Sequence, residues 1–192
     1  MSNDIADAAR LAALRTDQDE PAALDGGLSP EDFKLAFRNH AAGVALITAD
    51  AGDGPVALTA TSVFSVSAEP PLLIFSISSA SSSAPTIRKA ETLIVHLLGA
   101  DQLDLAKLGA TSGIDRFADR SIWDRLITGE PYFPAAHAWI RGRVINRMEA
   151  GTSTVIAVHA LQAKLPEDAG DAAPLVYHNR RYHSLGDHSA LS

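Results

Sequence analysis

The chain has 192 residues and a mass of 20.2 kDa, enough for one domain with a sizeable core. Because it contains no cysteine, a disulfide framework, a thiolate metal site and a cysteine nucleophile are all excluded. The formal net charge is −7, and residues 1–28 carry six acids and two bases, which leaves −3 for the rest. A body so close to neutral lacks the basic surface that nucleic-acid binding requires.

No apolar run approaches the roughly 20 residues needed to span a bilayer. The first residues also lack the basic segment and apolar block of a secretory signal. We therefore expect a cytoplasmic protein that acts on neither membranes nor nucleic acid.

The N-terminal part differs in composition from the rest. Residues 4–18 are rich in Ala and Leu and favour a short helix, but the acids, Pro21 and glycines that follow are typical of a tether. We expect residues 1–28 to form an extension, either a tether or a loosely docked helix. The predicted domain then covers residues 29–186, and residues 187–192 form a tail.

The first strong helix signal begins at Ser29. This residue suits an N-cap, Pro30 suits the first helical position, and two acids occupy the first turn. The pattern predicts a helix from about residue 30 to 40, with Phe33, Ala36 and Phe37 on one face.

The remainder reads as strands joined by short reversals, with small helices between them. Strands are expected at 43–48, from about 56 to the turn at Glu69-Pro70-Pro71, and at 72–77, 92–98, 138–148, 152–164 and 175–182. Short helices are expected at 83–90 and 101–108, and residues 109–135 are mostly loop. This series predicts a mainly β fold with short helices, closed into an antiparallel barrel because closure leaves no exposed edge.

One later strand shows two distinct faces. The face expected to meet the core carries Ala138, Ile140, Gly142, Val144 and Met148. The opposite face carries Arg141, Arg143 and Arg147.

Three other functional readings fail on their physical requirements. Residues 52–57 fit the dinucleotide pattern G-x-G-x-x-G/A, but Pro55 and a strand follow where a helix must begin. His178, His183 and His188 recur every five residues, which on a strand turns alternate rings to opposite faces and cannot assemble a metal site. A hydrolase is disfavoured because the chain has neither a G-x-S-x-G elbow nor an S-x-x-K pair.

The most informative stretch is ALTATSVFSVSAEPPLLIFSISSASSS, residues 57–83. A Thr/Ser-rich strand turns at a Pro-Pro pair, returns as an apolar strand and ends in serines. It is accompanied, in order, by FKLAFRNHAAGVALIT before it and by IRKAETLIVHLLGADQ, DRF and PLVYHNRRYHSL after it. Together these segments resemble the flavin reductase-like family, the FMN-binding split barrels, over about residues 33–185.

The resemblance implies a set of flavin-binding residues. Backbone amides and hydroxyls of Thr59 to Ser62 would meet the N5 atom and carbonyl edge of the flavin, and Ser81 to Ser83 would bind its phosphate. Arg116 would lie near the phosphate or ribityl chain. The implied cofactor-binding residues are Thr59, Ala60, Thr61, Ser62, Ser76, Ile77, Ser81, Ser82, Ser83, Arg116 and Phe117. The alternatives are a Thr-rich strand, a flexible Ser-rich loop and an ordinary surface ion pair at Arg116.

His178 matches a histidine that the family places near the mouth of the flavin site. A ring N–H there would position the nicotinamide, whereas the alternative is a packing role on a late strand. The chain departs from the family pattern at Ala42, which lacks a hydroxyl, at His96, where Asn is usual, and at Arg180, where Gly is usual.

The implied activity is that of an NAD(P)H:flavin oxidoreductase. NADH or NADPH would transfer a hydride to FMN or FAD, and the reduced flavin would serve a partner monooxygenase or an external acceptor. A homodimer is expected from the same resemblance. The alternatives are a split barrel that stores or senses flavin without turnover, and a pyridoxamine-phosphate-oxidase-like enzyme, which the order of motifs does not support.

Overall fold

The structure is a computed structural model that describes residues 26–165 and 173–191. It divides into two compact units, Met1–Ala36 and Phe37–Ser192. The helix expected at residues 4–18 lies outside the described residues. In the described ranges, no helix is long and apolar enough to cross a membrane.

Helix α2 (Pro30–Arg38) begins where the sequence predicts. Its cap is Ser29, whose Oγ accepts a hydrogen bond from the Asp32 amide at 3.1 Å and donates one to the Asp32 carboxylate at 2.7 Å. The helix ends two residues earlier than expected, and none of its residues is buried.

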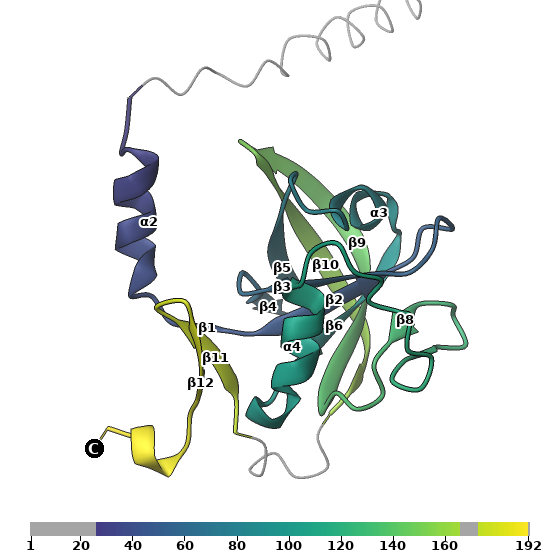
Figure 1. The fold of residues 1–192 in the computed structure, drawn as a ribbon. Coiled ribbons are helices and arrows are strands. Elements are labelled where there is room, and N and C mark those ends of the chain that lie inside the picture. Colours follow the sequence, from purple (N-terminus) through teal and green to yellow (C-terminus); the bar gives the residue numbers. More distant parts are fainter. Residues whose placement is uncertain (1–25, 166–172, 192) are drawn as a thin grey trace, which may run out of the picture. The chain divides into compact units, whose positions relative to one another are not determined.

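The largest part of the fold is one seven-stranded antiparallel sheet (Figure 1). Its order is β3-β2-β6-β9-β10-β5-β4. The strands are β2 (Ala45–Ala49), β3 (Val56–Ala60), β4 (Phe64–Ala68), β5 (Pro71–Ser78), β6 (Thr92–Leu97), β9 (Ala138–Ala150) and β10 (Ser153–Lys164).

Two smaller sheets and four short helical segments complete the described structure. The first small sheet has the order β1-β11-β12, and the second pairs β7 with β8. Their bounds are β1 (Ala42–Gly43), β7 (Asp124–Arg125), β8 (Pro131–Tyr132), β11 (Leu175–His178) and β12 (Arg181–Ser184). The helical segments are α3 (Ala84–Lys89), η1 (Ala100–Gln102), α4 (Leu103–Ala110) and η2 (Asp187–Ser189). The predicted mainly β fold with short helices is thus confirmed.

The hydrogen-bonded ladder of the main sheet is open, with β3 and β4 as its two edge strands. Barrel closure is therefore not observed in the described strands. The sheet nevertheless curls, since Ser62, just after β3, is joined to Ser76 on β5. The Ser62 Oγ donates to the Ser76 carbonyl at 3.1 Å and accepts from the Ser76 amide at 3.0 Å.

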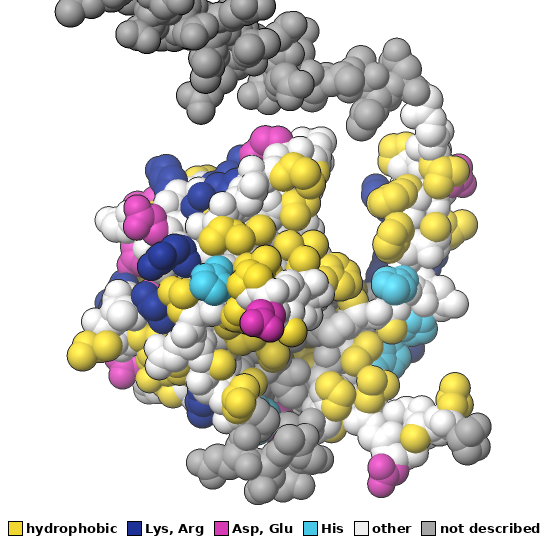
Figure 2. All heavy atoms as spheres, turned by 180° about the vertical axis from the view of Figure 1, so that it is seen from behind, with side chains coloured by type: hydrophobic (Ala, Val, Ile, Leu, Met, Phe, Trp, Pro, Cys, Tyr) yellow, Lys and Arg dark blue, Asp and Glu magenta, His cyan; other side chains and the backbone are white. Residues whose placement is uncertain are grey.

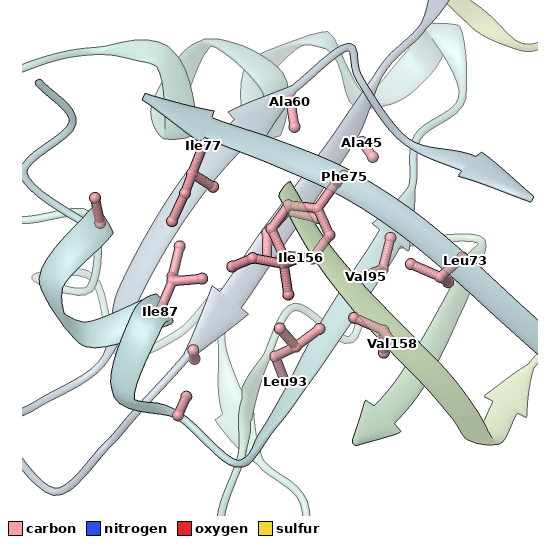
Figure 3. Close-up of a cluster of buried hydrophobic side chains, with 14 residues drawn as sticks. Ala45, Ala60, Leu73, Phe75, Ile77, Ile87, Leu93, Val95, Ile156 and Val158 are labelled. Atoms are coloured by element: carbon pink, nitrogen blue, oxygen red, sulfur yellow. The ribbon is translucent and has the colours of Figure 1, made fainter. Parts of the chain in front are cut away.

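The inside of this curl holds the main hydrophobic core. Figure 3 shows Phe75, Ile156 and Val95 pointing toward one another from β5, β10 and β6. Each of these three side chains is at most 1% exposed. Alternate residues of β2, β5, β6 and β10 face this core, as the period of two requires.

The strand expected at residues 43–48 is divided at Val44, between β1 and β2. The Val44 amide donates to the Leu175 carbonyl at 3.1 Å, and its carbonyl accepts from the Leu98 amide at 3.2 Å. This residue therefore joins the small sheet of β11 to the end of β6. Such long-range bonds leave no mark in local sequence, so the break could not be predicted.

Three further strand predictions are corrected. The strand expected after residue 56 is two strands, β3 and β4, which lie at opposite edges of the sheet. Met148 is 57% exposed rather than in the core, because the end of β9 that carries it is exposed throughout. The strand expected at 175–182 is the hairpin of β11 and β12, which reverses at Asn179 and Arg180.

Arg180, which stands where the family usually has Gly, occupies a strained position in the hairpin turn. Asn179 and Arg180 have φ values of 46° and 63°, the left-handed backbone of a two-residue hairpin turn. Asn tolerates this conformation, but Arg is strained by its Cβ. Glycine at the second position would remove the clash.

We predict that Arg180→Gly raises the free energy of unfolding by roughly 0.5–1 kcal/mol, since relief of left-handed strain exceeds the added chain entropy of glycine. Urea unfolding monitored by circular dichroism measures the change. The matched control is Arg181→Gly on strand β12, which should lower stability. A stability of Arg180→Gly equal to or below that of the wild type would contradict the prediction.

Candidate functional site

Thr59, in the Thr/Ser-rich strand, is engaged with helix α4. Its hydroxyl donates to the Ala106 carbonyl at 2.7 Å. Helix and strand touch at Gly109, where an added Cβ would lie 2.4 Å from the Thr59 Oγ1 and 2.2 Å from the Leu46 Cδ1. The Thr59 hydroxyl thus holds α4 against β3, and the Thr59 amide nitrogen also faces Gly109, 3.0 Å from the position of an added Cβ.

The next three residues have different surroundings. Ala60 is buried in the main core, while Thr61 is exposed. Ser62 uses its hydroxyl to join Ser76, and Ile77 is buried in the core at 1% exposure. In this part of the expected set, Thr61 carries the hydroxyl that faces outward.

The three serines of the loop before α3 differ in burial: Ser83 is buried, Ser81 is half-buried and Ser82 is exposed. Ser83 is 1% exposed, and its hydroxyl donates to the Ala57 carbonyl at 2.8 Å, which pins the loop to β3. Ser81 is half-buried and its Oγ accepts from the Ser83 amide at 3.3 Å, whereas Ser82 is exposed. Sequence reasoning groups the three serines, but the structure separates Ser83 from the other two.

Two arginines hold buried Nε atoms that make no hydrogen bond within the described residues, one on Arg88 of α3 and one on Arg116. Arg116 donates from Nη2 to the Thr111 carbonyl at 2.7 Å, directly after α4. Thr59 and Arg116 are therefore both anchored to α4 or its end. An unused N–H on each arginine suits an anionic ligand oxygen.

Phe117 is a core residue of the described structure. Its ring centroid lies 4.9 Å from that of Trp123 and 5.6 Å from that of Phe133, and the side chain is 5% exposed. Its aromatic contacts fix the loop that presents Arg116. A direct contact of Phe117 with flavin stays a prediction.

His178, at the end of β11, is half-buried and bonded to Asn39. The Nε2 of His178 lies 2.8 Å from the Asn39 Oδ1. The His178 ring packs against that of His183 with centroids 5.5 Å apart. The role of Asn39 could not be predicted from the sequence because Asn39 lies 139 residues from His178 along the chain.

His96 is a structural residue. It is fully buried, with Nδ1 donating to the Leu46 carbonyl at 2.8 Å and Nε2 accepting from the Phe133 amide at 3.1 Å. Burial lowers the pKa of His96 from 6.5 to about 4, so the ring stays neutral near pH 7. This histidine, where the family usually has Asn, connects β2, β6 and the loop before β9.

The part of the chain that the structure describes contains no group of three or more His, Asp or Glu placed to hold a metal ion.

The family model for the flavin reductase like domain matches residues 37–186 of the chain. The chain belongs to the flavin reductase-like family. Its relatives include an NADH:FMN oxidoreductase of Rhodococcus qingshengii, 42% identical over 165 residues that cover 83% of this chain and 84% of the relative. Another is the reductase component of a 4-nitrophenol 4-monooxygenase/4-nitrocatechol 2-monooxygenase of Rhodococcus opacus, 32% identical over 81% of this chain and 80% of that protein.

The solved structures extend the family match to the fold. The crystal structure of a flavin reductase domain protein from Arthrobacter sp. FB24 has a TM-score of 0.76 and 34% identity, and covers 81% of this chain and 95% of that chain. The resemblance that the sequence motifs indicate is confirmed.

The buried His96 predicts a pH dependence of stability. Because the folded pKa of about 4 lies below the ordinary 6.5, the unfolded chain alone binds a proton between these values. The stabilisation is complete above pH 6.5 and is lost as the pH falls toward 4, a change on the order of 3 kcal/mol. Urea unfolding at several pH values measures it. His96→Asn should flatten the dependence of the free energy of unfolding on pH. Above pH 7, the same variant measures how much the substitution alone changes the free energy of unfolding. An unchanged pH dependence in the variant would show that His96 is not its cause.

Proposed function

We propose that the chain is an NAD(P)H:flavin oxidoreductase that transfers a hydride from NADH or NADPH to FMN or FAD. The family match over residues 37–186, with a 42% identical relative named NADH:FMN oxidoreductase, carries the proposal. That relative favours NADH as donor and FMN as acceptor.

The residues present fit a flavin phosphate and ring. At the loop entering α3, Ser82 is exposed and Ser81 is half-buried, and Arg88 and Arg116 each hold an unused buried N–H. We assign the phosphate to this serine loop and the ribityl chain or phosphate to Arg116. Ser83 holds the loop against β3 through its hydrogen bond to the Ala57 carbonyl.

The ring edge is assigned to the end of β3. When bound, the flavin supplies an N5 atom that accepts hydride and a ring that takes up the resulting negative charge. The backbone amides of residues 59–62 and the Thr61 hydroxyl would then act as preorganised donors toward that charge. Ser62 and Ser76 hold this backbone in place through their mutual hydrogen bonds.

His178 is assigned to the nicotinamide. It lies at the end of β11, whose neighbour β1 leads directly into β2, and β2 begins with Ala45 opposite Ala60. His178 and the end of β3 therefore border the same short stretch of chain. Holding two reactants in a fixed geometry can lower a bimolecular barrier by several kcal/mol, so no acid or base is needed.

We further propose a homodimer built on the split barrel of residues 29–186, with residues 1–28 as an extension and 187–192 as a tail. Edge strand β4 carries Phe64 and Val66 at 51% and 56% exposure, and Met148 of β9 is also exposed. Figure 2 shows hydrophobic side chains gathered in the middle of the face that it draws. Exposed apolar groups at a sheet edge favour pairing with another chain. The bonds between Ser62 and Ser76 support closure of the barrel.

The reduced flavin is proposed to leave for a partner monooxygenase or an external acceptor. The relative from Rhodococcus opacus, named as the reductase component of a 4-nitrophenol 4-monooxygenase/4-nitrocatechol 2-monooxygenase, supports this role.

We predict that purified protein oxidises NADH or NADPH only when flavin is added. Anaerobic absorbance at 340 nm, with FMN, FAD and riboflavin tested in turn, measures the reaction. Tight flavin binding without nicotinamide oxidation in any combination would favour storage or sensing instead.

The serine loop makes a second prediction. Ser81→Ala with Ser82→Ala should weaken FMN binding by about 1.5–3 kcal/mol per hydroxyl lost from a charged phosphate, and leave riboflavin binding nearly unchanged. Ser83→Ala is the matched control: it should lower the melting temperature because it leaves the buried Ala57 carbonyl unsatisfied. Isothermal titration calorimetry measures the affinity of each variant for FMN and for riboflavin. Equal losses for FMN and riboflavin in the Ser81/Ser82 variant would rule the loop out as the phosphate site.

A further inference from the structure

The contact of His178 with Asn39 determines which nitrogen of a neutral imidazole ring carries the proton. An amide oxygen only accepts hydrogen bonds, so the Nε2 of His178, 2.8 Å from the Asn39 Oδ1, must carry the proton. A neutral ring protonated at Nε2 has an unprotonated Nδ1. Among the described residues, no hydrogen bond is formed to this Nδ1.

The position of Asn39 is itself fixed by the hairpin. Asn39 follows directly after helix α2, and the carbonyl of the last helical residue, Arg38, accepts from the Asn179 amide at 3.2 Å. Asn179 belongs to the turn next to His178. The backbone bond and the side-chain bond therefore join the same two segments, residues 38–39 and 178–179.

The other side of His178 is held by β12. The ring packs on His183 with an interplanar angle of 57°, and the Nε2 of His183 lies 3.3 Å from the His178 carbonyl. His178 is thus held on two sides, with its Nδ1 lone pair available to a donor.

We propose that Asn39 is a positioning residue, which keeps His178 protonated at Nε2 so that Nδ1 accepts a hydrogen bond from the carboxamide N–H of the nicotinamide. The inference rests on the proposed function. The inference goes beyond the proposed function by naming the residue that sets the tautomer of His178 and the group of the substrate that His178 recognises.

The direct test is a histidine ¹⁵N–¹H NMR spectrum of the full chain without nicotinamide. An imidazole N–H held in a hydrogen bond exchanges slowly enough to be seen, and His178→Gln identifies its signal by removing it. We expect the signal in wild type, its loss in Asn39→Ala, and its retention in Asn39→Asp, which keeps an acceptor oxygen. Asn146→Ala, an exposed asparagine on β9, is the matched control and should leave the signal unchanged.

The kinetic test compares NADH with an analogue of NADH in which an acetyl group replaces the carboxamide of the nicotinamide. Asn39→Ala should lower kcat/KM for NADH about three- to tenfold, the range expected for one neutral hydrogen bond. The loss should fall on KM, with FMN affinity and melting temperature nearly unchanged, and Asn39→Asp should recover most of it. The analogue has no N–H to donate, so its kcat/KM should be nearly the same in wild type and Asn39→Ala.

Different outcomes would overturn the role of Asn39 and the proposed function. A His178 signal that survives in Asn39→Ala, or equal losses for NADH and the acetyl analogue, would overturn the role of Asn39 while NADH oxidation by the wild type continues. Wild-type protein that oxidises neither NADH nor NADPH with any flavin would instead overturn the proposed function.

Discussion

Backbone carbonyl groups buried beneath the strands must be satisfied, and the chain does this with side chains that reach across from neighbouring elements. Four buried or half-buried polar side chains each donate to a carbonyl far away in sequence. They are Thr48 on Pro131, Thr59 on Ala106, Ser83 on Ala57 and His96 on Leu46. Three of these bonds attach α4, the loop before α3 and β8 to the main sheet, and the fourth joins β6 to β2 within it. Each joins segments far apart in sequence, and the loss of one such hydrogen bond costs roughly 0.5–1.5 kcal/mol.

This requirement divides the hydroxyls of the signature segment into two groups. Thr59, Ser62 and Ser83 hold the backbone, whereas Thr61 and Ser82 have exposed side chains. A ligand at this site would therefore meet a backbone that is already fixed, with few side chains left to rearrange. Such preorganisation suits stabilisation of charge on a bound ring, because the donors need no reorganisation when charge develops.

The small sheet of β1, β11 and β12 is joined to the end of β6 at several points, one of which is the bond from the Leu175 amide to the Leu98 carbonyl at 3.1 Å. Val44 bonds to Leu175 and Leu98, and thereby links this sheet to β6. The hairpin in turn holds residues 38–39 through Asn179 and His178. A strained left-handed Arg180 at the turn is compatible with a hairpin that is fixed from several sides rather than by its turn alone.

The sequence by itself determined the family, the mainly β class and most element positions, because these follow from local periodicity, caps and the order of motifs. Helix α2 starts at Pro30 behind its Ser29 cap, as its local chemistry requires. Only the tertiary structure decided which hydroxyls are structural, that β3 and β4 lie at opposite edges, and that the last strand is a hairpin. It alone paired His178 with Asn39 and buried His96. These features depend on contacts between residues far apart in the chain, and a side chain's local sequence is the same whether its hydroxyl meets a ligand or a distant carbonyl.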